Sequence, residues 1–374
     1  MADAVASGDD ERAQDRVMES VFLCTLFGGL GGIFLVGFPR TALSAVLPQG
    51  AAAMDYAAPY LRWRALSIVP ALLSSTGFAA YRGLLNTVTP LKVSFAANAL
   101  NLILDPALIF NAGMGFVGAA LATAVAETLS GMVYMKLLMR RKLVVLRKLF
   151  KPPSLESLVP ILEGASAMLV RQLAINLSYI AAARKAQAMD PTHGVAAAAY
   201  GIVFQLYSIG IVINIAMQNT AATLVPAARA KEGDDSARRT ADRTFVWGTV
   251  VGVLLAAFQF FSLPYVVPLF STLPHVQEAA RTPAMIAALL HILNGPGFTG
   301  HGVMLGLGQY KDLALITAAS TVALVAALTS WLGTTLEGIL FAQIFYCVIN
   351  GVGVLWHYFR VGPLATRKKK SASG

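Results

Sequence analysis

The chain has 374 residues, of which 56% are hydrophobic and only 13% are charged, and its mean hydropathy is +0.65. A soluble domain carries about twice that charged fraction, so the composition excludes an ordinary soluble protein and indicates a polytopic helical membrane protein. The net charge of +10 is concentrated in a few loops and the tail, which argues against a nucleic-acid-binding face. No Cys or His spacing predicts a metal site, and we expect Cys24 and Cys347, which lie in apolar segments, to be buried thiols.

Residues 1–17 are polar and rich in acidic side chains, and they lack the basic start and apolar core of a secretory signal. Apolar blocks of about 20 residues then alternate with short polar turns, which is the pattern of membrane-spanning helices. We predict about ten spans, at residues 18–38, 61–80, 93–110, 115–138, 158–183, 195–225, 245–267, 284–307, 313–332 and 339–359.

Lysines and arginines gather in three places, at residues 136–151, 229–243 and 367–370, whereas the loops on the other side of the predicted bundle carry few. The positive-inside rule then places these three regions in the cytosol or its topological equivalent. The chain is thereby divided into five predicted parts. They are a polar N-terminal segment (1–17), a four-helix N-lobe (18–139), a basic cytosolic linker (140–156), a six-helix C-lobe (157–360) and a basic cytosolic tail (361–374).

The two halves of the chain resemble each other. Residues 21–39, 82–104 and 115–138 align with residues 245–264, 302–324 and 335–359 in the same order. The first four spans therefore match the last four as parallel repeats related by an axis along the membrane normal. Since the second half has two more spans in front, we expect a six-plus-six architecture whose first two helices this chain lacks.

The hairpin at residues 81–110 carries an unusual polar stripe. Asn98, Asn101 and Asp105 are spaced i, i+3 and i+7 in an otherwise apolar helix, so they share one helical face. An ionisable residue at that depth faces the protein interior or a water-filled cavity. Alternatively, Asp105 caps or kinks the helix, because Pro106 frees a backbone carbonyl.

Three motifs in this region are specific in combination. Their residues are Arg82, Gly83, Thr87, Thr89 and Pro90; Asn101, Leu104, Asp105 and Pro106; and Gly115, Gly118, Ala119, Ala120 and Glu127. They resemble the F-R-G-x-x-D-T-x-T-P, N-x-x-L-D-P and G-x-x-G-A-A motifs of the multidrug and toxic compound extrusion (MATE) transporters. The similarity is greatest to the branch of the plant DETOXIFICATION proteins, which export citrate and phenolic acids, and of the bacterial DinF-like members. In the second half, Arg171 resembles an arginine of the seventh family helix, and residues 198–205 resemble a run in the eighth.

The resemblance covers roughly residues 16–360 and implies an all-α, two-lobe membrane bundle of twelve helices, of which about ten are present here. It also implies export of a small molecule across the lipid bilayer by antiport with a coupling ion, H⁺ or Na⁺, and no other cofactor. We expect a monomer with no nucleic-acid partner, in the plasma membrane or in an organelle envelope such as that of a plastid. The chain departs from the family at Asn86 and His301, where many relatives have Asp. The absent first family helix carries an Asp that is linked to coupling in some members.

The candidate substrate and ion pathway consists of polar residues inside apolar spans. They are Asn98, Asn101, Asp105, Glu127, Arg171, Asn176, Gln205 and His301. Each has a second interpretation: Glu127 can pair with a loop cation, and Arg171 either recognises an anion or forms an ion pair with Asp105 or Glu127. The amides can simply hydrogen-bond between helices, and His301 is either an interior histidine or a proton carrier.

These features predict a secondary efflux transporter that works by alternating access between two lobes. Its substrate would be an organic anion such as citrate or a phenolic acid, or a small xenobiotic. A lipid-linked precursor flippase of the same shape would need more cationic residues in the cleft than Arg171, and an inactive fragment is a further alternative. No nucleophile-base pair, metal-ligand set or pair of carboxylates at fixed spacing supports a membrane enzyme.

Overall fold

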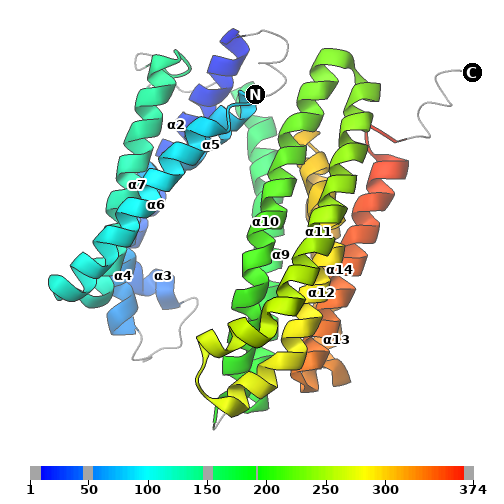
Figure 1. Ribbon diagram of the computed structural model, residues 1–374. Helices are drawn as coiled ribbons and strands as arrows, with labels where there is room; N and C mark the ends of the chain where they lie inside the picture. The colour runs from blue at the N-terminus through cyan, green and yellow to red at the C-terminus, as the bar shows by residue number, and fades with distance from the viewer. Residues whose placement is uncertain (1–9, 45–53, 146–154, 191–192, 366–374) are drawn as a thin grey trace, which may run out of the picture. The chain divides into compact units, whose positions relative to one another are not determined.

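The computed structural model describes residues 10–44, 54–145, 155–190 and 193–365, and every regular element within these ranges is a helix (Figure 1). The all-α prediction is therefore confirmed. The chain divides into two compact units, residues 1–158 and 159–374, which we describe separately. Parts of the predicted N-terminal segment, linker and tail lie outside the described residues, and the domain boundaries of the sequence analysis stay predictions.

Unit 1 consists of helices that pack around α7. Its elements are α2 (Asp10–Gly37), α3 (Pro39–Ser44), α4 (Met54–Leu66), α5 (Ile68–Gly83), α6 (Val88–Pro106), η1 (Ala107–Asn111) and α7 (Gly115–Arg140). Helices α4, α5 and α6 each contact α7, and α2 covers α4 and α5. A core of apolar residues from α2, α5 and α7, centred on Tyr81, Tyr134 and Leu138, holds one end of the unit together.

The predicted span 61–80 is broken into α4 and α5 at Ser67. The backbone N–H of Ser67 bonds to the Arg64 carbonyl, three residues back, instead of the carbonyl four residues back that an α-helix uses. Pro70 explains the break. It has no N–H to donate to the carbonyl of Leu66, and its ring would clash with that carbonyl in a continuous helix. At this break the Ser67 side chain lies beside α7, where its hydroxyl takes part in the site described below.

Helix α6 does not end at the Asp105–Pro106 pair but continues as a π-helical turn, Ala107–Asn111. A π turn leaves backbone carbonyls without their usual i+4 donors and commonly marks a functional position. Gly118 of α7 packs against the backbone of Leu108 in this turn, so that a side chain at residue 118 would clash. The turn is thereby fixed against the start of α7.

Within the described residues, unit 2 is a bundle of the long helices α9 to α14, which run side by side (Figure 1). Its elements are α9 (Leu155–Met189), α10 (Val195–Glu232), α11 (Asp234–Phe270), α12 (Pro274–Gly306), α13 (Tyr310–Thr329), η2 (Trp331–Thr334), α14 (Leu336–Trp356) and η3 (His357–Val361). Helix α12 contacts α10, α11 and α14 and is the centre of the bundle. Gly252 of α11 and Gly295 of α12 allow these two backbones to approach each other closely.

The internal repeat of the sequence reappears as a repeated pattern of contacts. In unit 1, α2 contacts α5, and both α5 and α6 contact α7; in unit 2, α11 contacts α12, and both α12 and α13 contact α14. The order along the chain is the same in both units. Helices α9 and α10 precede this four-helix pattern in unit 2, as the sequence alignment of the two halves predicts.

All ten predicted spans are helical, and eight helices of the described residues are long and apolar enough to cross a membrane. The two exceptions have local causes. The span 61–80 is divided into helices of 13 and 16 residues by the break at Ser67. Helix α12 carries polar side chains, including the buried His291, Asn294 and His301, which make the segment less apolar than the other long helices.

Candidate functional site

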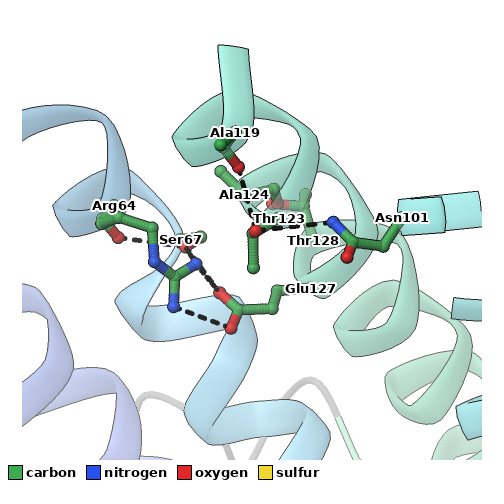
Figure 2. A network of polar contacts seen from close by, with 8 residues as sticks. All are labelled: Arg64, Ser67, Asn101, Ala119, Thr123, Ala124, Glu127 and Thr128. Carbon is green, nitrogen blue, oxygen red and sulfur yellow. Dashed lines mark hydrogen bonds and ion pairs between the residues drawn. The ribbon is translucent and has the colours of Figure 1, made fainter. Parts of the chain in front are cut away.

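Glu127 of α7 is held by two residues at the break between α4 and α5 (Figure 2). The Arg64 guanidinium donates to both carboxylate oxygens, from Nη1 to Oε2 at 2.7 Å and from Nη2 to Oε1 at 3.0 Å. The Ser67 hydroxyl also donates to Oε2, at 2.7 Å. The partner of Glu127 is thus a helix residue and not a loop cation. Because both of its oxygens are already paired inside unit 1, an ion pair with Arg171 is not needed to explain its charge.

The second polar group of unit 1 lies between α6 and α7 (Figure 2). Asn101 Nδ2 lies 3.4 Å from Thr123 Oγ1. Turning the Asn101 amide by half a rotation gives a better arrangement, in which Nδ2 donates to Asp105 Oδ2 at 3.2 Å and Oδ1 accepts from the Thr123 backbone at 3.2 Å. The predicted i, i+4 relation of Asn101 and Asp105 is therefore a direct contact, whereas Asn98 is exposed.

Asp105 is only partly satisfied by this arrangement. Its Oδ1 atom is buried, and no described residue donates a hydrogen bond to it. No described lysine, arginine or histidine forms an ion pair with its carboxylate either. A buried carboxylate oxygen without a partner is costly. The position therefore has the chemical character of a site that takes up a proton or accepts a small cation.

Arg171 of α9 contacts α12 and, through it, α14. Its Nη2 atom lies 3.3 Å from His301 Nδ1, and His301 Nε2 is hydrogen-bonded to Asn350 Oδ1. A guanidinium can only donate, so Nδ1 accepts, Nε2 carries the proton, and the imidazole is the neutral tautomer that donates to Asn350. Both ring nitrogens of His301, which is only 5% exposed, are thereby satisfied.

These three residues line a cavity of unit 2 with a volume of about 390 Å³. Its other walls consist of amide, aromatic and aliphatic side chains, with Gln218 from α10, Asn294 and Phe298 from α12, and Tyr179 from α9 among them. Among the described residues of unit 2, no carboxylate forms an ion pair with Arg171, and its Nε atom is buried without a hydrogen-bond partner. The cavity therefore presents one uncompensated cationic group within a wall of amide, aromatic and aliphatic side chains.

The deeper wall of the cavity is a polar chain within the bundle core. Asn294 Nδ2 donates to the Tyr207 hydroxyl at 2.8 Å, and the Cys347 thiol points at Asn294 Oδ1 at 3.5 Å. The Tyr207 ring stacks on the ring of His291 at 5.1 Å between centroids. These contacts satisfy Asn294 and fix this wall of the cavity.

The structure brings together some of the predicted site residues and not others. Arg171 and His301 share the unit 2 cavity, but Asn176 is exposed and bonded to Gln172 at 3.2 Å. Gln205 is exposed and lies outside the lining. The sequence analysis missed Arg64, Ser67 and Asn350 as site residues. For Arg64 a signal existed, since it is a charged residue inside a predicted span; no comparable signal distinguishes Asn350 from other buried amides.

The fold is that of solved MATE transporters. A MATE crystal structure in complex with MaL6 superimposes with a TM-score of 0.87 at 20% sequence identity, covering 97% of this chain and 82% of that one. A structure described as a MOP superfamily transporter from Pyrococcus furiosus gives a TM-score of 0.87 at 19% identity, with the same coverage. These similarities define the class of protein, a polytopic helical membrane protein with the MATE fold.

The family model MatE matches residues 1–107 and 168–332, and the chain belongs to this family. The protein DETOXIFICATION 44, chloroplastic, of Arabidopsis thaliana is 26% identical over 251 residues, which are 67% of this chain and 47% of that protein. Protein DETOXIFICATION 43 of the same plant is 23% identical over 95% of this chain and 66% of its own length. The Staphylococcus haemolyticus multidrug export protein MepA is 23% identical over 79% of this chain and 65% of its own. The chain thus spans about half to two thirds of the length of these relatives.

Proposed function

We propose that this chain forms the transport unit of an efflux antiporter that exports an organic anion, such as citrate or a phenolic acid. One observation carries the proposal: Arg171 lies in the unit 2 cavity without a carboxylate partner among the described residues of its unit. A charged group at membrane depth is costly unless it is paired. An anionic substrate would supply the missing charge, and its carboxylate fits the planar fork of a guanidinium through two parallel hydrogen bonds.

Asp105 is our candidate for the coupling-ion site. Its buried Oδ1 accepts no hydrogen bond from the described residues, and protonation would remove the negative charge from this buried carboxylate. A sodium ion would instead bind to the carboxylate, with the Thr123 hydroxyl, which lies next to the Asn101 side chain, as our candidate for a further ligand. In this proposal the protein acts as a monomer by alternating access of its two lobes and needs no organic cofactor.

The membrane is part of the proposal as well. The eight apolar helices indicate a multi-span membrane protein. The name of one relative, DETOXIFICATION 44, includes the word chloroplastic, which favours an organelle envelope over the plasma membrane. Fractionation of the source cells followed by immunodetection tests this assignment, which is independent of the substrate.

A second candidate substrate class is a lipophilic cation or other small xenobiotic. The aromatic walls of the cavity, with Tyr179, Tyr346 and Phe298, favour it, because rings of this kind bind cations over their faces. One relative is named a multidrug export protein. In this alternative Arg171 is a structural residue that His301 holds in place. A flippase is less well supported, since Arg171 is the one lysine or arginine among the described residues that line the cavity.

The two substrate classes differ in how transport responds to Arg171→Lys. If Arg171 binds a carboxylate through two parallel hydrogen bonds, lysine keeps the charge but cannot form both bonds. The citrate concentration for half-maximal transport should then rise at least about tenfold, equivalent to about 1.4 kcal/mol. At a structural position, lysine should leave transport nearly intact. The measurement is uptake of labelled citrate and of a cationic dye into everted vesicles that hold this chain. Arg184→Lys, at an exposed position of the same helix, is the matched control. Dye uptake without citrate uptake, unaffected by Arg171→Lys, would refute the organic-anion proposal.

A further inference from the structure

Three buried polar atoms of residues that line the unit 2 cavity have no hydrogen-bond partner among the described residues. They are Arg171 Nε, Asn350 Nδ2 and Gln218 Oε1. Buried polar atoms in folded proteins are nearly always paired, so three unpaired ones around a single cavity need an explanation. Water can pair with such atoms, and a ligand with complementary groups can take the place of that water. The three atoms comprise two donors and one acceptor.

The two donors are positioned by one residue, His301. Its Nδ1 accepts from Arg171 Nη2, and its Nε2 donates to Asn350 Oδ1. These bonds use the acceptor of Asn350 and one N–H group of Arg171, which leaves Asn350 Nδ2 and Arg171 Nε unused. A carboxylate has two oxygens that only accept, so it complements a pair of donors of which one is charged. A carboxylate bound by these donors would make His301 a positioning residue and Asn350 a second donor to the anion.

Gln218 Oε1 is an acceptor and cannot hydrogen-bond to a carboxylate oxygen, which also only accepts. It complements a group that donates, such as a hydroxyl. Tyr179, Tyr346 and Phe298 line the same cavity, whose volume of about 390 Å³ is in the range of small-molecule sites. We infer that Gln218 is a specificity-determining residue, through which this cavity prefers anions that carry a hydroxyl group in addition to a carboxylate. This inference rests on the proposed function, because it specifies which organic anions the cavity takes.

Matched acids that differ by one hydroxyl test the inference. The pairs are benzoate against 3-hydroxybenzoate, benzoate against 4-hydroxybenzoate, and tricarballylate against citrate, and their dissociation constants are measured by calorimetry on the purified full chain. We expect the hydroxylated acid of at least one pair to bind about fivefold more tightly, the equivalent of about 1 kcal/mol. Gln218→Met, which keeps the length of the side chain but removes the acceptor, should abolish that preference and leave the acid without a hydroxyl bound as before.

A second variant separates the carboxylate site from the hydroxyl site. Asn350→Asp keeps the oxygen that accepts from His301 but replaces the Nδ2 donor by an anionic oxygen. It should weaken both acids of a pair by more than tenfold without changing their ratio. Gln187→Met, at an exposed position of α9 outside the cavity lining, is the control and should bind all acids as the wild type does.

The possible results separate this inference from the proposed function. If the wild-type chain binds neither acid of any pair, the organic-anion proposal fails, and the inference fails with it. If it binds the acids but without preference in all three pairs, or if the preference survives in Gln218→Met, only the inference is overturned. The wild-type ratio needs no variant, so equal affinities within all three pairs overturn the inference even if Gln218→Met does not fold.

Discussion

Arg64 and Glu127 connect α4 to α7 through two hydrogen bonds of 2.7 and 3.0 Å between a guanidinium and a carboxylate. Ser67, at the break between α4 and α5, donates a third bond to the same carboxylate. The three residues join the interrupted helix to its neighbour at the point where the backbone ladder is discontinuous. The ion pair therefore fixes the end of α4 against α7 at the place where the predicted span is interrupted.

We expect Arg64→Ala to destabilise the protein, because it leaves the Glu127 carboxylate without its counter-charge. The side chains are 28% and 27% exposed, between the surface and the interior, so the loss should be about 2 kcal/mol, between the values for exposed and buried pairs. The apparent melting temperature of the detergent-purified protein should fall by several degrees. A double variant, Arg64→Met with Glu127→Met, should recover most of the loss, since it removes the stranded charge.

The exposed pair of Arg40 and Asp55 provides the control for this experiment. Its side chains are 73% and 76% exposed, and exposed pairs contribute little. Arg40→Ala should therefore leave the melting temperature unchanged. Equal melting temperatures for Arg64→Ala and the wild type would show that the Arg64–Glu127 pair has no structural role.

The Arg64–Glu127 pair also illustrates what the sequence can and cannot predict here. Apolar blocks and turns predict the ten helices, because a helix pairs its backbone N–H and C=O groups within one segment, as the absence of water inside a membrane requires. The contact of Asn101 with Asp105 follows from helical spacing alone. The contact between Arg64 and Glu127 depends on how α4 and α7 cross, and this crossing follows from the break that Pro70 imposes. The same holds for Arg171, His301 and Asn350, which come from three helices and meet only through tertiary packing.

Close packing of α11 on α12 predicts a strong effect of a single methyl group. A Cβ atom at Gly295 would overlap the Gly248 carbonyl oxygen, which belongs to the helix backbone and cannot rotate away. We expect Gly295→Ala to cost roughly 1–3 kcal/mol by overpacking and to lower the amount of folded protein in the membrane. Size-exclusion chromatography of a fluorescent fusion measures this amount.

Gly351 of α14 is the matched position, because no atom lies within 4 Å of a Cβ placed there. Gly351→Ala should accumulate at wild-type levels, with at most a small gain from the better helix propensity of alanine. If Gly295→Ala accumulates as well as Gly351→Ala, the close approach of α11 and α12 described above is incorrect.

The orientation in the membrane follows from the basic residues around the predicted linker. Arg141 follows the end of α7 and Asn111 ends η1, at opposite ends of the α7 hairpin, and both are exposed. We predict that Arg141 faces the cytosol and Asn111 the opposite side. Arg141→Cys should react with an impermeant thiol reagent only after permeabilisation, whereas Asn111→Cys should react in intact cells. The reverse pattern of labelling would show that the chain has the opposite orientation in the membrane.

The last prediction concerns the separation of binding from coupling at Asp105. Asp105→Asn keeps the size of the side chain and its contact with Asn101, but it removes the group that can take up a proton or ligate sodium. If Asp105 is the coupling-ion site, efflux driven by an ion gradient should be lost, because the gradient no longer acts on the protein. Exchange of labelled for unlabelled substrate across vesicles without a gradient should remain, because the unit 2 cavity is unchanged.

Thr123→Val, which removes the neighbouring hydroxyl, should impair sodium-driven more than proton-driven efflux, since only sodium needs this oxygen as a ligand. Gradient-driven efflux at wild-type rates in Asp105→Asn would instead assign Asp105 to the packing of α6 and its π turn.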